Sequence, residues 1–385
     1  MDILQDLLDK SHPLNNGDFL LRDAGPMQKK VLDTLRLTDE FRTLYGSFLL
    51  DRYPKGIAVR EAVEAIQKFH GISQVDLKKY RDLIIDLIYT RNVLDFKMWE
   101  YFSYGLQDKT IRERLEFISN KDIFFYYKAL NTKSMGTKWT TYVRFKDYYK
   151  RDVIRVRGEE DKSALAAFSA RHPRFLIKTV GSSMGKGVRI VETRDYANVD
   201  QLYEAIAAPK TVLCEELIVQ SKEFRRIHPA SVNTVRVFTY FNGKDTTIVG
   251  SFMRAGRGSA VVDNAGAGGV LTYVDCEKGI VTTDAADEMG RTYPTHPDTG
   301  FVFKGFQIPR WAELTAMLKE MAPMWPEVPM VGWDIALSEE KGWQIIEGNQ
   351  MGQLNLLQIP TKKGLRKDLT QRFEWEKHRA KLKQE

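Results

Sequence analysis

Residues 331–350, "VGWDIALSEEKGWQIIEGNQ", narrow the choice of architecture more than any other part of the chain. Two apolar runs flank a short polar segment, a pattern that predicts a β-hairpin. A turn at residues 339–342 would pair Ser338 with Trp343. The apolar face of this hairpin, which we expect in the core because side chains alternate along a strand, carries Val331, Trp333, Ile335, Leu337, Gln344 and Ile346.

The same register predicts an acidic face on the other side of the hairpin. Asp334 would lie directly across from Glu347, and Asn349 would share their face. Two opposed carboxylates repel each other unless a cation lies between them. Oxygen ligands without a nearby His or Cys favour Mg²⁺ over zinc. We therefore expect a magnesium site here; the alternative is an exposed hairpin with incidental acids.

A second stretch, "KTVGSSMGKGVRIVE" at residues 178–192, is rich in glycine and lysine. A P-loop needs four residues between its first glycine and a Gly-Lys pair, whereas three residues separate Gly181 from Gly185. A Rossmann turn would open a helix, but "GVRIVE" continues as a strand. The stretch therefore predicts a hairpin flap whose backbone N–H groups, with the Ser182 and Ser183 hydroxyls, can cover a phosphate chain. Taken alone, a structural glycine hairpin explains it as well.

Composition and charge are those of a globular protein without a membrane span. The 385 residues are 43% hydrophobic and 28% charged, with a net charge of +7. The stretch from Lys362 to Glu385 has nine Lys or Arg and four Asp or Glu, a local balance of +5. We expect it to form a basic helix docked on the body; contact with an acidic or membrane surface is the alternative. The N-terminus has no signal-peptide pattern, so we expect a cytoplasmic protein.

The chain divides into a helical front and a strand-rich body. Residues 1–118 have leucines and isoleucines at helical spacing and no ligand-like cluster. From Arg174 onward, short β-rich runs alternate with turns, and a helix is expected from Trp311 to Pro323. The runs are "RFLIKTV", "GVRIVE", "TVLCEELIV", "TVRVFTYFNG", "TTIVGSFMRAG", "VGWDIALS" and "GWQIIEGN". This pattern predicts an α+β body.

The ordered set of motifs resembles the ATP-grasp superfamily. Its parts are a lysine that closes a strand, a Ser/Gly-rich flap, a "CEELI" strand-to-linker segment and a terminal "D…EGN" hairpin. The stretches "ASVNTVRVFTY", "VVDNAGAGGVLTYVD" and "HPDTGFVFKGFQIPRW" look like the sugar-transfer-associated branch, over about Ser119 to Pro360. The resemblance implies two α+β subdomains that grip ATP, at residues 119–215 and 216–360, after the helical region 1–118 and before a basic helix at 361–385.

The resemblance also implies roles for individual residues. Lys178 matches the lysine that reaches the α- and β-phosphates, and Lys121 an earlier phosphate-reaching lysine, with Lys128 as its competitor. Glu223 is offered for the ribose hydroxyls, although "VQSKE" departs by one residue from the common spacing. The flap corresponds to Ser182, Ser183, Gly185, Lys186 and Gly187. The adenine hinge corresponds to Glu215, Glu216, Leu217 and Ile218. The metal ligands correspond to Asp334, Glu347 and Asn349.

Two arginines are expected to line the same cleft. In ATP-grasp enzymes, arginines placed like Arg236 and Arg254 neutralise the transferring phosphoryl group or the acyl phosphate, a task that suits a planar donor that is always charged. A salt-bridge role is the alternative for each. Asp263 and Asn264, before the glycine-rich "AGAGG", look like a branch-specific loop for which substrate contact and turn formation are equally open.

The resemblance implies an ATP-dependent carboxylate–amine ligase. The expected cofactors are ATP and two Mg²⁺ ions, for which Mn²⁺ can substitute. The γ-phosphoryl group passes to a substrate carboxylate, an amine attacks the acyl phosphate, and an amide leaves with ADP and phosphate. The expected partners are a small-molecule carboxylate and an amine, with a cell-surface sugar or uronic acid precursor as the acceptor, and no nucleic acid. The alternatives are an ATP-grasp kinase acting on a hydroxyl and a non-catalytic nucleotide-binding protein.

Overall fold

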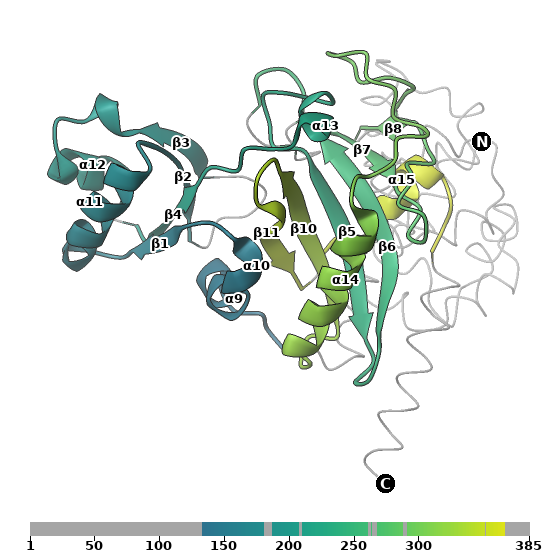
Figure 1. Cartoon of the computed structure of the whole chain (residues 1–385), viewed down its shortest axis with the longest axis horizontal. Helices are drawn as coiled ribbons and strands as arrows, with labels where there is room; N and C mark the ends of the chain where they lie inside the picture. The colour runs from purple at the N-terminus through teal and green to yellow at the C-terminus, as the bar shows by residue number, and fades with distance from the viewer. Residues whose placement is uncertain are drawn as a thin grey trace, which may run out of the picture. The chain divides into compact units, whose positions relative to one another are not determined.

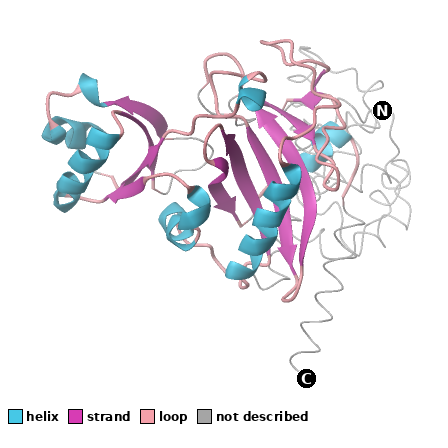
Figure 2. Cartoon of the chain, in the orientation of Figure 1, coloured by secondary structure: helices cyan, strands magenta, loops and turns pink. Residues whose placement is uncertain are grey.

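The protein has an α+β architecture built from two antiparallel sheets (Figures 1 and 2). A computed structural model describes residues 133–180, 187–207, 210–260, 263, 268–287, 291–350 and 352–365. Within these residues, one sheet has four strands and the other has seven. The expected α+β class is confirmed.

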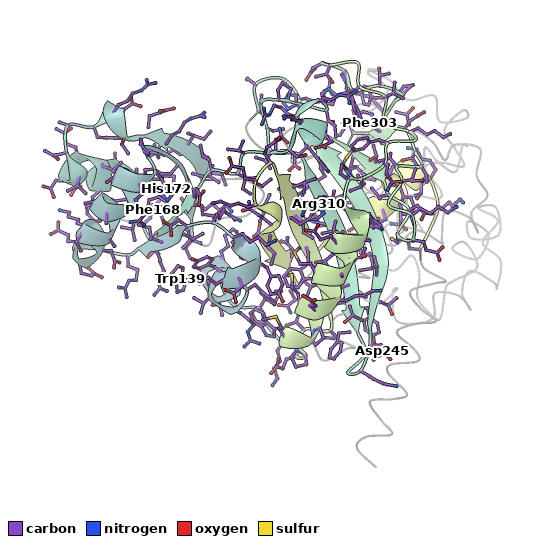
Figure 3. The ribbon with its side chains drawn as sticks, viewed as in Figure 1. Trp139, Phe168, His172, Asp245, Phe303 and Arg310 are labelled. Atoms are coloured by element: carbon purple, nitrogen blue, oxygen red, sulfur yellow. The ribbon has the colours of Figure 1, made fainter. Side chains whose placement is uncertain are left out.

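The four-stranded sheet has the order β1-β4-β2-β3. Its strands are β1 (Val153–Val156), β2 (Arg174–Thr179), β3 (Val188–Glu192) and β4 (Val212–Glu216). Two helices, α11 (Lys162–Arg171) and α12 (Val199–Ile206), bury their apolar side chains in a core shared with these strands. Figure 3 labels Phe168 of this core and the neighbouring His172, whose ring centroids lie 4.7 Å apart.

The seven-stranded sheet has the order β11-β10-β5-β6-β7-β8-β9. Its long strands are β5 (Thr234–Phe241), β6 (Thr246–Ala255), β10 (Met330–Ser338) and β11 (Gly342–Asn349), and its short ones are β7 (Val270–Tyr273), β8 (Ala285–Ala286) and β9 (Thr292–Tyr293). The other described α-helices are α9 (Lys138–Arg144), α10 (Lys146–Tyr149), α13 (Lys222–Arg225), α14 (Trp311–Met321) and α15 (Gln358–Thr361).

One face of the seven-stranded sheet packs in the main hydrophobic core. Val235 of β5, Met253 of β6 and Ile335 of β10 are buried there with Leu314 and Leu318 of α14. Because side chains alternate along a strand, the residues between them point to the opposite face. Arg236, Arg254 and Asp334 therefore share that opposite face, which carries the candidate site.

The strands expected from the sequence are present. The two runs that flank the glycine-rich flap form the antiparallel pair β2–β3, so the predicted hairpin is confirmed. The helix expected from Trp311 begins at that residue and ends at Met321, before Pro323. Strands β1, β7, β8 and β9 were not predicted; each has four residues or fewer, too short for a periodic signal.

The register of the β10–β11 hairpin corrects part of the sequence analysis. Asp334 pairs with Glu347 as predicted, but Ser338 pairs with Gly342 and not with Trp343. The register skips Ile346, which forms a β-bulge. Consequently Trp343 and Ile345 pack in the core, where Gln344 and Ile346 had been expected.

The described strands and helices lie almost wholly in one compact unit, residues 130–288 with 292–360. The predicted helical front and most of the predicted basic C-terminal helix lie outside the described residues. Within the part of the chain that is described, no helix is long and apolar enough to cross a membrane.

Candidate active site

The acidic pair lies on the β10–β11 hairpin. Asp334 and Glu347 are Cα partners, and Asn349 pairs with Gly332 one step along the same face. Asp334 is buried, with 4% of its surface exposed, whereas the Glu347 side chain is 32% exposed. The Asn349 amide Nδ2 donates to Asp334 Oδ2 at 3.4 Å. The three residues that the sequence analysis grouped as metal ligands are therefore brought together.

Two arginines hold the Asp334 carboxylate. Arg236 on β5 donates from Nε to Oδ1 at 2.6 Å and from Nη2 to Oδ2 at 2.5 Å. Arg254 on β6 places Nη2 3.0 Å from Oδ1. Burial alone would raise the pKa of Asp334, but the two guanidinium charges outweigh it and lower the pKa to about 2. The salt-bridge role considered for both arginines is thus present at the site itself.

Asp263 completes this buried network from the next loop. Its Oδ2 accepts hydrogen bonds from the backbone N–H of Thr234, at 2.8 Å, and from the hydroxyl of the same residue. Arg254 Nε lies 3.6 Å from Asp263 Oδ1 and donates to Thr234 Oγ1 at 3.0 Å. Burial raises the pKa of Asp263 despite these contacts. Asp263 therefore fixes the orientation of Arg254, while Asn264 lies outside the described residues.

Two buried histidines hold the segment between β6 and Asp263. His228 Nε2 donates to the carbonyl of Gly258 at 3.0 Å, and His296 Nε2 donates to that of Gly256 at 2.8 Å. Their rings stack with centroids 5.4 Å apart. Burial lowers the pKa of His296, whose Nδ1 accepts from a backbone N–H. A neutral imidazole that donates from Nε2 therefore anchors this segment.

Glu347 has a partner that the sequence analysis missed. Lys138, the first residue of α9, places Nζ 2.9 Å from Glu347 Oε1. Thr137 precedes it as the N-cap and forms a capping box with Thr140. Thr137 is a favourable N-cap residue that could have suggested a helix start, but nothing in the sequence indicates that the first lysine of this helix meets the acidic hairpin.

A second charged cluster lies around Glu215 on β4. Lys178 on β2 is buried, and its Nζ lies 2.8 Å from Glu215 Oε1. Arg151, also missed by the sequence analysis, donates to Glu215 Oε2 from Nη2 at 2.7 Å and from Nε at 3.1 Å. Burial tends to raise the pKa of Glu215, but Lys178 and Arg151 outweigh it and lower the pKa to about 2. Glu215 is therefore a carboxylate shared by two buried cations.

The other residues of the predicted hinge follow Glu215. Glu216 accepts from Lys341 Nζ at 2.5 Å and from the backbone N–H of Asp152 at 2.9 Å. Leu217 and Ile218 come directly after β4 and are partly buried. They lead towards α13. Glu223, which was predicted to bind the ribose hydroxyls, lies in that helix and is exposed.

Only the last residue of the predicted flap is described. Gly187 precedes β3 and has φ = +76°, a left-handed conformation that favours glycine. Its carbonyl accepts from Thr179 N–H at 3.2 Å, which closes the β2–β3 pair. The predicted phosphate-binding residues Lys121, Ser182, Ser183, Gly185 and Lys186, and the competitor Lys128, lie outside the described residues.

The hairpin residues fit a hard divalent cation. They offer carboxylate and amide oxygens from one face, the ligand set that Mg²⁺ prefers. The described residues contain no cluster of three or more His, Cys, Asp or Glu side chains suited to a metal. The site would thus rest on Asp334, Glu347 and Asn349 together with ligands from the substrate, and an arriving ion would share Asp334 with the arginines.

The family of the chain follows from a sequence comparison. Residues 112–374 match the family described as sugar-transfer associated ATP-grasp. The chain belongs to this family. The resemblance inferred from the motifs is confirmed, and with it the expected ATP-grasp fold.

Solved structures similar to this ATP-grasp protein are distant. The ATP-grasp ligase PsnB complexed with a minimal precursor is 12% identical, with 62% of this chain and 60% of that chain covered and a TM-score of 0.38. D-alanyl-alanine synthetase A from Vibrio cholerae is 14% identical, with 58% and 59% covered and a TM-score of 0.35. The ADP complex of purK, an N5-carboxyaminoimidazole ribonucleotide synthetase, is 12% identical, with 62% and 57% covered and a TM-score of 0.35. This chain thus spans 57–60% of the length of these structures. The sequence matches no curated protein.

Proposed function

We propose that this ATP-grasp protein is an ADP-forming carboxylate–amine ligase. The observation that carries the proposal is the pairing of Asp334 and Glu347 beneath two buried arginines, Arg236 and Arg254. Such a site concentrates charge for the transfer of a phosphoryl group, and phosphoryl transfer needs positioning and charge neutralisation more than a protein nucleophile.

On the nucleotide side, Lys178 would meet the α- and β-phosphates. It is 7% exposed and lies beside the predicted hinge, so its ammonium is largely shielded from water, and Glu215 offsets only part of its charge. The backbone of residues 216–218 would hold the adenine edge. Lys138, already beside Glu347, is a described candidate for a second phosphate-reaching lysine, next to the proposed Lys121.

On the metal side, Asp334, Glu347 and Asn349 would hold Mg²⁺. When bound, the ion would neutralise charge on the β- and γ-phosphates and align them for in-line transfer. Arg254 Nη1 makes no hydrogen bond to the described residues, so that edge of the guanidinium can meet an incoming anion. Arg236 is held from three sides, by both Asp334 oxygens and by the Gly352 carbonyl at 3.2 Å, and would act as a fixed positive charge.

The reaction proceeds in two transfers. The substrate carboxylate takes the γ-phosphoryl group of ATP and releases ADP, while Arg254 balances the charge that develops on the transferring group. An amine then attacks the acyl phosphate, loses a proton and expels inorganic phosphate, which leaves an amide. Closure of the β2–β3 hairpin over the site would keep water from hydrolysing the acyl phosphate. The family description associates such proteins with sugar transfer, and we propose a precursor of a cell-surface sugar, such as a uronic acid, as the acceptor.

The test is mass spectrometry of a small-metabolite extract incubated with the protein, Mg²⁺ and ATP. The matched control is Glu347→Gln, which alters the proposed metal site at a partly exposed position. We expect a product equal to two metabolites joined with loss of water, formed together with ADP and phosphate, and absent from the control.

Two results would contradict the proposal. A product with one added phosphoryl group, with ADP and no free phosphate, would make the protein a kinase. Absence of ATP-dependent products, with nucleotide binding intact, would favour a non-catalytic nucleotide-binding protein.

A further inference from the structure

We propose that Arg151 is a positioning residue that sets Lys178 for nucleotide phosphate and ties it to the acidic hairpin. This inference rests on the proposed function in one respect, namely that Lys178 binds nucleotide. Arg151 follows α10 and precedes β1, and no sequence motif singles it out. It is nevertheless 7% exposed, an unusual burial for an arginine that requires compensating partners.

The guanidinium of Arg151 is bonded on every side. Nε and Nη2 grip Glu215 Oε2 at 3.1 and 2.7 Å. Nη1 donates to the carbonyl of Ile345 at 2.5 Å and to that of Tyr149 at 3.3 Å. The carbon at the centre of the guanidinium lies 4.7 Å from the centroid of the Tyr149 ring, a cation–π contact. The orientation of Arg151 is therefore fixed by three separate segments of the chain.

Among the described residues in direct contact in this cluster, positive charges outnumber negative ones. Arg151 and Lys178 carry two positive charges, and Glu215 carries one negative charge. Tyr149 stays neutral because burial raises its pKa. One carboxylate therefore serves two buried cations, so neither cation is fully neutralised by it. With Arg151 on one Glu215 oxygen, the carboxylate neutralises Lys178 only in part, and the ammonium retains its attraction for phosphate.

The bond to Ile345 links this cluster to the metal side of the site. Ile345 is the last residue of β11 before the bulge at Ile346, and Glu347 follows directly. Arg151 thus holds β4 and β11 through one rigid group. Loss of the guanidinium would free Glu215 to pair with Lys178 alone and would release the Ile345 carbonyl.

Lysine cannot replace Arg151 fully. A lysine keeps the charge, but its single ammonium cannot make the two parallel bonds to Glu215 and also reach the Ile345 carbonyl in the same geometry. Arg151→Met removes both the charge and the hydrogen bonds, whereas Arg151→Lys keeps the charge and loses part of the hydrogen bonding. Arg157→Met is the matched control, because Arg157 lies just after β1 and its ion pair with Asp161 is 50% exposed on the arginine side.

The experiment measures the dissociation constant of Mg-ADP by titration calorimetry, at a temperature where circular dichroism shows each variant fully folded. We expect Arg151→Met to weaken binding about tenfold, a loss of about 1.4 kcal/mol. Arg151→Lys should fall between this variant and the wild type, and Arg157→Met should remain within about twofold of the wild type.

A double-mutant cycle separates positioning from general destabilisation. If Arg151 acts through Lys178, Arg151→Met should change Mg-ADP affinity far less in a Lys178→Ala background than in the wild type. Equal losses of Mg-ADP affinity in both backgrounds, or unchanged affinity in Arg151→Met and Arg151→Lys, would overturn the positioning role of Arg151 and leave the proposed function standing. A wild-type protein that binds no adenine nucleotide would overturn the proposed function and this inference with it.

Discussion

Replacing Asp334 by asparagine removes one negative charge from between two buried guanidinium groups. The substitution keeps the size of the side chain, so packing changes little and electrostatics dominates the effect. In the folded protein the carboxylate accepts from Arg236 at 2.6 and 2.5 Å and from Arg254 at 3.0 Å. Asparagine can accept hydrogen bonds through its single side-chain oxygen only, and its amide N–H groups would face the guanidinium groups of Arg236 and Arg254.

The structure gives two routes to the size of the effect. The pKa of Asp334 falls from 3.8 to about 2 on folding, which corresponds to about 2 kcal/mol at 1.36 kcal/mol per unit. Breaking a buried ion pair by removing one partner costs about 3–5 kcal/mol. We expect a loss of about 3 kcal/mol at pH 7. For a domain of this size that loss lowers the melting temperature by about 6–12 °C.

The sign of the pH dependence is also fixed. The pKa of Asp334 is lower in the folded than in the unfolded protein. Its ionisation therefore contributes fully to the free energy of unfolding above about pH 4, and this contribution is lost as the pH falls towards 2. Urea unfolding of the wild type and of Asp334→Asn between pH 7 and pH 2.5 measures this difference. Asp245→Asn is the control, because Asp245 is an exposed acid at the β5–β6 turn (Figure 3) and should change stability by less than about 0.5 kcal/mol. A variant as stable as the wild type at pH 7, or a difference that does not shrink in acid, would refute the reasoning.

Two further substitutions probe the β10–β11 hairpin and the segment that follows it. Glu347→Gln breaks a partly exposed ion pair with Lys138 and should cost less than about 1 kcal/mol of stability. It should nevertheless weaken nucleotide binding about tenfold in the presence of Mg²⁺ and leave metal-free binding unchanged, which calorimetry with and without Mg²⁺ checks. If the variant and the wild type bind the nucleotide equally well in the presence of Mg²⁺, Glu347 is not part of the metal site. Gly352→Ala should destabilise the protein by about 1–3 kcal/mol in urea unfolding, because a Cβ there would lie 2.9 Å from the Gly332 Cα, and overpacking against backbone is not easily relieved. An unchanged free energy of unfolding would mean that the segments around Gly332 and Gly352 can move apart without cost.

The sequence predicted those parts of the fold that have a strong local signal. The β-branched runs became strands, and the opposition of Asp334 and Glu347 followed from the two-residue period of a strand. The bulge at Ile346 could not be foreseen, since nothing in "GWQIIEGN" distinguishes an unpaired isoleucine from a paired one. The pairing near the turn is therefore shifted by one residue from the prediction, whereas the pairing of Asp334 with Glu347 agrees with it.

The ion-pair networks lay beyond the reach of the sequence. Arg236 and Arg254 were placed near the site by resemblance, but their shared hold on Asp334 depends on the pairing of β5 with both β6 and β10. Arg151 contacts Glu215, 64 positions away, and Ile345, 194 positions away. Contacts at such separations are set by tertiary packing, for which a single sequence carries no periodic signal.

The bulge at Ile346 lets one short strand serve both sides of the sheet. In a regular strand, residues 343, 345, 347 and 349 would all point the same way. The unpaired residue reverses the parity, so the aromatic and aliphatic side chains of the first half enter the core while the acid and the amide of the second half emerge at the site. A transfer of the proposed site onto another hairpin would have to include this extra residue, since a hairpin with regular pairing would bury the proposed ligands or expose the tryptophan. The turn at residues 339–341, by contrast, lies at the far end of the hairpin from the bulge and can be rebuilt without moving the proposed metal ligands.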